Sequence, residues 1–192
     1  MPKGEEMKLI IGISGASGVI IAVELLKRLK NFSDVETHLI VTEGAALTFE
    51  HETNFDLREV KRLADKVYDV NEMDASIASG SFLTDGMIIV PCSMKTVAGI
   101  ASGYAENLLL RAADVCIKER RKLIIVPREI PFSRIHLKNM LELSTNGVII
   151  LPPLMTFYNV PTTIQDQIDH IVGKILNQFN LPSKIREWNP DK

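Results

Sequence analysis

The stretch that most constrains this chain covers residues 8–30. Residues 9–13 are apolar and rich in isoleucine, which is typical of a strand buried on both faces. Five small residues follow at 14–18, and apolar residues then recur at helical spacing over 19–30. The stretch therefore predicts a strand, a glycine-rich turn and a helix that packs on a sheet.

The turn at 14–18 has two interpretations. Small side chains let backbone N–H groups approach a ligand, and the N-terminus of the next helix favours an anion, so the turn can be a phosphate site. A tight strand-to-helix connection without a ligand fits the same residues. The spacing matches neither GxGxxG nor GxxxxGK[ST], so neither a dinucleotide site nor a P-loop is indicated.

Strands and helices alternate along the rest of the chain, which predicts an α/β protein with a parallel sheet wound on both faces in a single domain. Residues 67–70 suggest a short or edge strand, and 73–82 a flexible loop. The other expected strands are 36–42, 86–90, 122–126 and 147–151, and the expected helices are 44–52, 57–66, 93–102, 107–120, 133–145 and 162–179.

Composition excludes several classes of protein. The net charge of -2 gives no bulk attraction for nucleic acid or an anionic membrane, and no apolar run reaches the ~18 residues of a membrane span. Two cysteines suit a reduced cytosolic protein better than a disulfide scaffold. The four histidines have no metal-ligand spacing. We therefore expect a cytoplasmic protein that binds no metal, nucleic acid or membrane.

Polar residues follow the expected strands, where parallel sheets bind their ligands. Ser93 and Thr96 offer two hydroxyls at a helix start, either as a plain N-cap or as a second anion site facing residues 14–18. Cys92 has no clear histidine partner, so we interpret it as a small residue after a buried strand rather than a nucleophile.

Charged residues at three places could complete an anion site. Arg128 and Glu129 follow a buried strand, where a charged pair is costly unless it is paired or used. Arg111 and Lys118 are seven apart on one helical face, which is either solvated or a second cationic pocket. Tyr158, on a proline-flanked loop, could close such a pocket or simply pack.

The motifs taken together resemble the UbiX-type flavin prenyltransferases, from about residue 8 to residue 181. The resemblance implies a flavodoxin-like (Rossmann-like) fold that binds FMN, with 1–7 as an N-terminal extension, 8–181 as the FMN-binding domain and 182–192 as a C-terminal tail. The motifs that carry it are GISGASG at 12–18, ETHL at 36–39, PCSMKT at 91–96, LLRAADV at 109–115, KERR at 118–121, VPRE at 126–129 and FY at 157–158.

The resemblance also implies an activity. The family joins a dimethylallyl unit from dimethylallyl phosphate to N5 and C6 of reduced FMN, without a metal. The product, prenylated FMN, serves UbiD-type decarboxylases. A homo-oligomer, as a rule a dodecamer, is expected.

Site residues follow by motif position. The implied catalytic residues are Glu129, Ser17 and Glu52. The implied contacts of FMN are Gly15, Ala16, Ser17, Thr42, Ser93, Met94, Lys95, Thr96 and Arg128. The implied contacts of the prenyl phosphate, contributed partly by neighbouring subunits, are Arg111, Lys118, Arg128, Glu129, Tyr158 and Lys174.

Three positions depart from the family pattern. Thr42 stands where serine is usual, Glu43 where lysine is frequent, and Lys174 where arginine is usual. Lysine keeps the charge of arginine but loses its bidentate fork. Two other functions remain open, a flavin-dependent decarboxylase acting directly on a small acid, and an FMN-binding accessory subunit of an aromatic acid decarboxylase.

Overall fold

The strands of the protein form one parallel sheet. The computed structural model describes residues 6–183 and 185, and in it the sheet has the order β3-β2-β1-β4-β5-β6. Its strands are β1 (Met7–Ile13), β2 (Val35–Val41), β3 (Lys66–Tyr68), β4 (Gly86–Cys92), β5 (Lys122–Pro127) and β6 (Ile149–Ile150).

The strand order confirms the predicted fold class. β1 pairs with β2 on one side and β4 on the other, so that Leu9 lies opposite both Thr37 and Gly86. The full order, 3-2-1-4-5-6, is that of Rossmann folds. Without the three-residue edge strand β3, the remaining five strands have the flavodoxin order, 2-1-3-4-5. In both descriptions the order reverses between β1 and β4.

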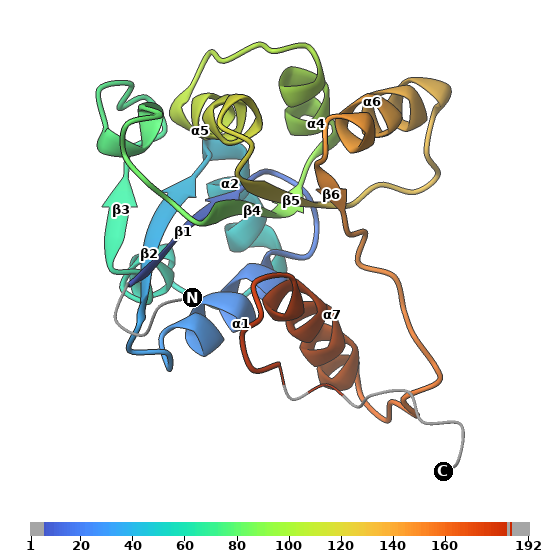
Figure 1. Cartoon of the computed structure of the whole chain (residues 1–192). Helices are drawn as coiled ribbons and strands as arrows, with labels where there is room; N and C mark the ends of the chain where they lie inside the picture. The colour runs from blue at the N-terminus through green and yellow to red at the C-terminus, as the bar shows by residue number, and fades with distance from the viewer. Residues whose placement is uncertain (1–5, 184, 186–192) are drawn as a thin grey trace. The chain divides into compact units, whose positions relative to one another are not determined.

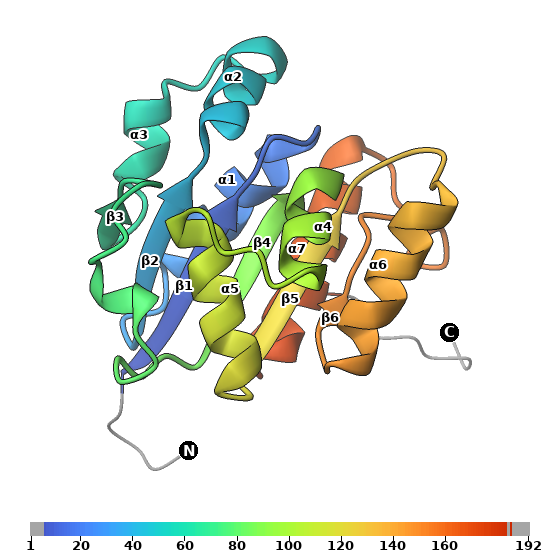
Figure 2. The same ribbon diagram turned by 90° about the horizontal axis from the view of Figure 1, so that it is seen from above.

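Helices cover both faces of the sheet. Figure 1 shows α1 on one face and α4, α5 and α6 on the other, and Figure 2 shows these last three side by side over the strands. The α-helices before residue 153 are α1 (Val19–Leu29), α2 (Glu43–Glu52), α3 (Leu57–Lys61), α4 (Met94–Ala101), α5 (Leu108–Lys118) and α6 (Arg134–Thr145).

Burial on both faces explains the continuous apolar runs of the central strands. Ile10 and Met87 belong to a cluster with the buried residues of α4, α5 and α6. Leu9 and Ile11 alternate with Ile10 along β1 and are also fully buried, so they face the opposite side. A strand buried in this way has no polar face, which is the pattern that predicted it.

Two expectations between β2 and β4 need correction. The helix expected at 57–66 ends at Lys61, because Lys66 pairs with His38 at the start of β3. The carboxylate of Asp65 accepts the N–H and the hydroxyl of Thr37, both at 2.8 Å. These bonds fix the connection from α3 to β3 against β2.

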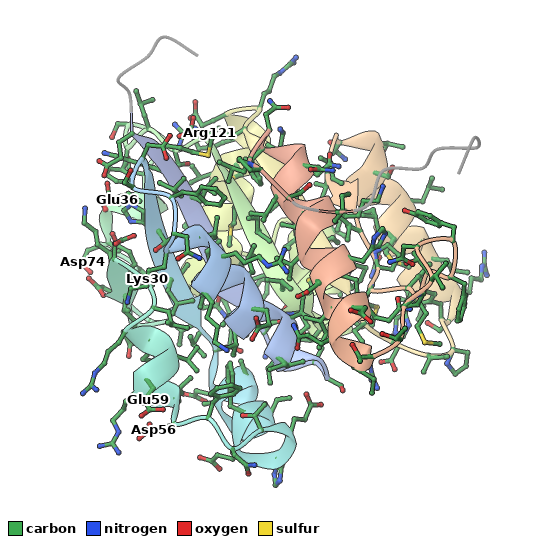
Figure 3. The ribbon with its side chains drawn as sticks, turned by 90° about the horizontal axis from the view of Figure 1, so that it is seen from below. Lys30, Glu36, Asp56, Glu59, Asp74 and Arg121 are labelled. Carbon is green, nitrogen blue, oxygen red and sulfur yellow. The ribbon has the colours of Figure 1, made fainter. Side chains whose placement is uncertain are left out.

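The segment expected as a flexible loop at 73–82 contains a short 3-10 helix, η1 (Ser76–Ala78). The guanidinium of Arg121 donates to the carbonyls of Gly80 (2.5 Å) and Phe82 (2.8 Å), so the loop is fastened to the end of α5. Figure 3 labels Arg121 and Glu36 at one end of the sheet, the end opposite to α2.

Residues 153–192 form a separate compact unit of the chain. Its helix, α7 (Ile164–Gln178), begins with a capping box. The hydroxyl of Thr163 accepts the N–H of Asp166 (3.2 Å), and the carboxylate of Asp166 accepts the N–H of Thr163 (2.8 Å). The domain boundaries at 8 and 181 stay a prediction, and most of the expected C-terminal tail at 182–192 lies outside the described residues. Within the described chain, no helix has the length and apolarity needed to cross a membrane.

Candidate functional site

A cavity of about 490 Å³ opens at the carboxyl edge of the sheet, where the strand order reverses. This is the position at which doubly wound sheets bind ligands, and the volume lies within the ~300–1,000 Å³ of small-molecule sites. Four connections line it, those that follow β1, β2, β3 and β4, together with the start of α5. The lining residues are Ser14, Gly15, Thr42, Glu43, Gly44, Val70, Asn71, Ser93, Lys95, Thr96, Glu106, Asn107, Leu109 and Leu110.

A glycine pair brings two of these connections into direct contact. A Cβ atom at Gly15 would lie 2.8 Å from the carbonyl carbon of Gly44, closer than real Cβ contacts allow. Only glycine at position 15 therefore lets the turn after β1 lie against the start of α2. The pair leaves backbone rather than side chain at this wall of the cavity.

The N-terminus of α2 supplies donors on one side. Thr42 is its N-cap, and the Thr42 hydroxyl accepts the N–H of Ala45 (3.2 Å). The carbonyl of Thr42 accepts the N–H of Ala46 (3.0 Å). The first N–H groups of a helix, here those of Glu43 and Gly44, have no partner within the helix and favour an anion.

The N-terminus of α4 supplies a second set. Ser93 is its N-cap, and its hydroxyl bonds both the N–H of Thr96 (3.3 Å) and the Thr96 hydroxyl (3.0 Å). The side chain of Met94 is half-buried and packs against the core, and Met94 does not line the cavity. Two helix N-termini and four hydroxyl side chains thus surround one cavity, which is the donor set that a phosphate needs.

Charges at the cavity are mixed. The ammonium of Lys95 lies 3.7 Å from the Glu106 carboxylate, and Glu43 adds a further negative charge. A hydrogen bond to Glu106 raises the pKa of the Tyr104 hydroxyl. Hydroxyls and backbone N–H groups, rather than a cluster of cations, therefore dominate the cavity lining.

Comparison with known proteins identifies the family. The family model described as Flavoprotein matches residues 2–180. A protein of Sedimentibacter hydroxybenzoicus named "Probable UbiX-like flavin prenyltransferase" is 58% identical over 187 residues, 97% of this chain and 99% of that protein. Flavin prenyltransferase LpdB of Lactiplantibacillus plantarum is 51% identical over 185 residues, 96% of this chain and 99% of that protein. The chain belongs to the UbiX-like flavin prenyltransferases.

Two solved structures extend the likeness to the fold. A structure of AnUbiX (PadA1) in complex with FMN and dimethylallyl pyrophosphate has a TM-score of 0.94 at 43% identity, covering 96% of this chain and 98% of that one. A dodecameric FMN-dependent UbiX-like decarboxylase from Escherichia coli O157:H7 has a TM-score of 0.93 at 50% identity, covering 95% of this chain and 100% of that one. The resemblance inferred from the sequence motifs is confirmed.

In this UbiX-like chain, most of the FMN contacts expected from the motifs meet at the cavity. Gly15, Thr42, Ser93, Lys95 and Thr96 all line it, and Ala16 and Ser17 continue the same turn. FMN fits this donor set, because the hydroxyls and helix N-termini suit its phosphate and Leu109 and Leu110 supply an apolar wall. Their individual contacts with FMN stay a prediction.

Glu52 lies at the other end of α2 and reaches the start of α1. Its carboxylate accepts the N–H of Gly18 at 2.8 Å. Gly18 is the N-cap of α1 and has φ 101°, in the left-handed region. The carboxylate therefore satisfies an N-terminal donor of α1 in place of an external anion. This contact gives Glu52 a structural role, and its expected catalytic role stays a prediction.

Arg128 and Glu129 follow β5, one strand along from the cavity, and do not line it. The N–H of Arg128 donates to the Cys92 carbonyl (3.2 Å), and the carboxylate of Glu129 accepts the N–H of Ile130 (3.1 Å). Within the described part of the chain, no ion pair joins Arg128 to Glu129. Both side chains lie at the carboxyl edge without pairing to each other.

The cations of α5 do not meet at the cavity within one chain. Arg111 donates to the Ala78 carbonyl (3.1 Å) and pairs with Asp114 (2.8 Å). Lys118 pairs with the adjacent Glu119 and lines a different hollow, with Lys122, at the amino edge of the sheet. Because α5 starts at the cavity and runs away from it, seven residues separate the two side chains by about 10 Å.

Tyr158 and Lys174 belong to the unit 153–192. The hydroxyl of Tyr158 lies 3.2 Å from Nε2 of His170. Burial lowers the pKa of His170, and the charge of Lys174 lowers it further, so the neutral ring can accept a hydrogen bond from the tyrosine hydroxyl. Sequence reasoning singled out Tyr158 and Lys174 but missed this buried histidine, which gave no periodic or spacing signal.

The structure bears on two other kinds of site, a cysteine nucleophile and a metal centre. Burial raises the pKa of the Cys92 thiol well above its usual range, which agrees with its interpretation as a core residue. No group of three or more metal-ligating side chains is found in the part of the chain that the structure describes. Val70 and Asn71 also line the cavity but were not among the expected site residues, although they follow β3 and parallel sheets bind ligands at the ends of their strands.

Proposed function

We propose that this UbiX-like chain binds FMN in the cavity and joins a dimethylallyl group from dimethylallyl phosphate to it. The observation that carries the proposal is the convergence of the α2 and α4 N-termini on one cavity at the reversal of strand order. The AnUbiX structure, which is described as a complex with FMN and dimethylallyl pyrophosphate, supports the choice of ligands.

In the proposed reaction, FMN provides the acceptor atoms and the cationic side chains bind the phosphate. FMN, when bound and reduced, supplies the ring atoms N5 and C6 that receive the dimethylallyl group. Breaking the allylic C–O bond leaves negative charge on the departing phosphate, which arginine and lysine stabilise. Arg128, at the carboxyl edge of this chain, is placed for that role, and we assign Arg111, Lys118, Tyr158 and Lys174 to the same phosphate, partly from neighbouring subunits.

We assign the proton transfers to Glu129 and Ser17. Glu129 lies at the carboxyl edge, and we propose that its carboxyl group exchanges a proton with the departing phosphate. Ser17 lies in the turn beside Gly15, where its hydroxyl can pass a proton near the flavin. Glu52 is proposed as a support of this turn through its contact with Gly18.

The product mass tests the proposal. Protein mixed with reduced FMN and dimethylallyl phosphate should yield FMN heavier by one dimethylallyl unit. Glu129→Gln should keep FMN binding and slow product formation by ~10²–10⁴-fold, as expected for loss of a general acid–base group. Glu59→Gln, which changes an exposed carboxylate on α3, is the matched control and should react at the wild-type rate.

Other outcomes would redirect the assignment. FMN binding without a heavier flavin would overturn the prenyltransferase and leave the decarboxylase and the accessory subunit. Release of CO₂ from a small aromatic acid by the protein alone would select the decarboxylase. Normal turnover by Glu129→Gln would remove Glu129 from the proton transfer while leaving the activity itself intact.

The wider setting belongs to the same proposal. We infer a homo-oligomer, because the Escherichia coli relative is described as dodecameric. UbiD-type decarboxylases are the proposed recipients of the product. We place the chain in the cytoplasm, where thiols stay reduced, since Cys92 and Cys116 are both free.

A further inference from the structure

Ser14 joins the two turns that form the floor of the cavity. It is the first residue after β1 and is only 1% exposed. Its hydroxyl donates to the carbonyl of Pro91 (3.1 Å) and accepts the N–H of Ser93 (2.8 Å). One side chain thus connects the glycine-rich turn to the N-cap of α4, 79 residues along the chain.

We propose that Ser14 is a positioning residue, which sets the separation of these turns and holds the start of α4 in the geometry that binds FMN. The inference rests on the proposed function only in taking FMN as the ligand. Ser14 lines the cavity, but its hydroxyl is hydrogen-bonded to Pro91 and Ser93, so we assign it no hydrogen bond to the flavin and no part in the reaction. It acts through Ser93.

The Ser14 hydrogen bonds are needed because the pairing of β1 with β4 ends before the two turns. Paired residues of these strands run from Leu9–Gly86 to Gly12–Ile89, so the pairing ends before Ser14 and Pro91. On the other side of β4, its register with β5 shifts between Ile89 and Cys92. Beyond that point β1 leads to α1 on one face and β4 leads to α4 on the other (Figure 1). The Ser14 contacts with Pro91 and Ser93 continue the connection past the ladder, where the strands diverge.

The Ser14 hydrogen bonds also determine which backbone N–H groups at the start of α4 are available to a ligand. Ser14 takes the N–H of Ser93, and the Ser93 hydroxyl takes that of Thr96. Those of Met94 and Lys95 have no partner within the helix, and Lys95 lines the cavity. Because the hydrogen bond from Ser93 to Ser14 fixes the start of α4, the N–H groups of Met94 and Lys95 need no reordering when an anion binds. Such preorganisation strengthens binding.

FMN affinity, measured by titration of flavin fluorescence, tests the proposal. Ser14→Ala removes the hydroxyl and leaves the Ser93 N–H without its buried partner, so FMN should bind about tenfold more weakly. Ser14→Thr restores a hydroxyl at the same atom and should bring the affinity back to within about threefold of wild type.

Thr37→Val is the matched control. The Thr37 side chain is also a buried hydroxyl that joins distant segments, since it donates to the Asp65 carboxylate (2.8 Å) and accepts the Asp65 N–H (3.0 Å). It lies five residues before Thr42 on β2, about 16 Å from the cavity edge. Both variants should lower the melting temperature, but Thr37→Val should leave the dissociation constant of FMN unchanged.

The outcomes separate positioning from plain stability. Equal FMN affinity in Ser14→Ala and Thr37→Val, with equal loss of melting temperature, would overturn the proposal. If Ser14→Ala does not fold, Ser14→Cys replaces it, because a thiol fills the space but accepts hydrogen bonds weakly, and unchanged affinity in that variant would also overturn it. The readout is FMN binding alone, so a protein that makes no prenylated product still gives a decision on Ser14.

Discussion

Glu43 places a negative charge beside a site proposed for a phosphate. As the first residue of α2, its carboxylate complements the positive end of the helix dipole, a contribution of about 0.3–1 kcal/mol. The same carboxylate lines the cavity and repels an anion there. The residue therefore stabilises the helix at the expense of ligand affinity.

Glu43→Gln should strengthen FMN binding. Removal of one like charge near the surface changes the interaction by somewhat less than 1 kcal/mol, so we expect the dissociation constant to fall about two- to fivefold. The gain should shrink in ~1 M salt, where the Debye length is about 3 Å. Glu50→Gln, on the same helix but outside the cavity lining, is the control. Equal gains in both variants, or a gain that survives high salt, would contradict this account.

Single residues differ in how far the sequence could place them. Gly15, Thr42, Ser93 and Thr96 were predictable, because each follows a buried strand and the ends of parallel strands meet. Glu52 was not, since its contact with the Gly18 N–H depends on how α2 lies against the start of α1. No local pattern encodes that distance of 34 residues along the chain.

At the scale of elements, α7 has the most strongly fixed start. Asp166 accepts the backbone N–H groups of Thr162 and Thr163 (both 2.8 Å), together with the Thr162 hydroxyl. These hydrogen bonds, led by those from the backbone, lower the pKa of Asp166 to about 2. The charged carboxylate is thus the form that the folded helix start prefers.

The start of α7 should loosen only in strong acid. Because the folded pKa of Asp166 is depressed from 3.8 to about 2, its contribution is complete above pH 4 and is lost as the pH falls towards 2. Hydrogen exchange by mass spectrometry, corrected for intrinsic rates, should show protection of residues 162–168 at pH 4 but not at pH 2. The Asp166→Asn variant should lack this protection even at pH 6, whereas the control variant Asp169→Asn should keep it. Loss of protection already at pH 4 in the wild type would contradict the assigned pKa.

Elements whose ends are set by distant partners were predicted less well than elements with local caps. The starts of α4 and α6 are capped by Ser93 and Ser133. The sequence indicated the Ser93 cap and a helix that starts at residue 133. It did not indicate the end of α3, because Lys66 leaves the helical pattern to pair with His38. Arg111 and Lys118 lie on one face of α5, as predicted. Only the start of that helix lines the cavity, however, and Lys118 at its end lines a different hollow.

At the scale of the whole molecule, the separation of Lys118 from Glu129 bears on the oligomer. Lys118 lies by the start of β5 and Glu129 just after its end, so the length of that strand, about 20 Å, lies between them. Large apolar side chains are also exposed at Ile130 (81%), Ile135 (69%) and Leu141 (66%), and burying them against another copy would stabilise an oligomer. Both observations favour a site completed by a neighbouring copy.

Mixed oligomers should recover activity that each variant lacks. If Lys118 and Glu129 of different chains meet at one site, random co-assembly of Lys118→Ala with Glu129→Gln leaves about one quarter of the sites with both native side chains. Co-expressed variants should then show roughly that fraction of wild-type turnover, measured as heavier flavin. Each variant co-expressed with itself is the control. A mixture no more active than the better variant would place both residues in one chain's site or outside the site.

The β1–β4 pairing also has a consequence for the time at which the protein acquires its ligand site. β2 follows β1 after one helix, but β4 joins β1 only across 77 residues, and parallel pairing over such a separation is slow. Until that pairing forms, Ser14 has no Pro91 to bond and the floor of the cavity does not exist. On the ribosome, the first 85 residues can therefore collapse before this cavity has formed. Free FMN can capture the chain only after its longest-range strand pairing, so it should slow unfolding without speeding the folding of the nascent protein.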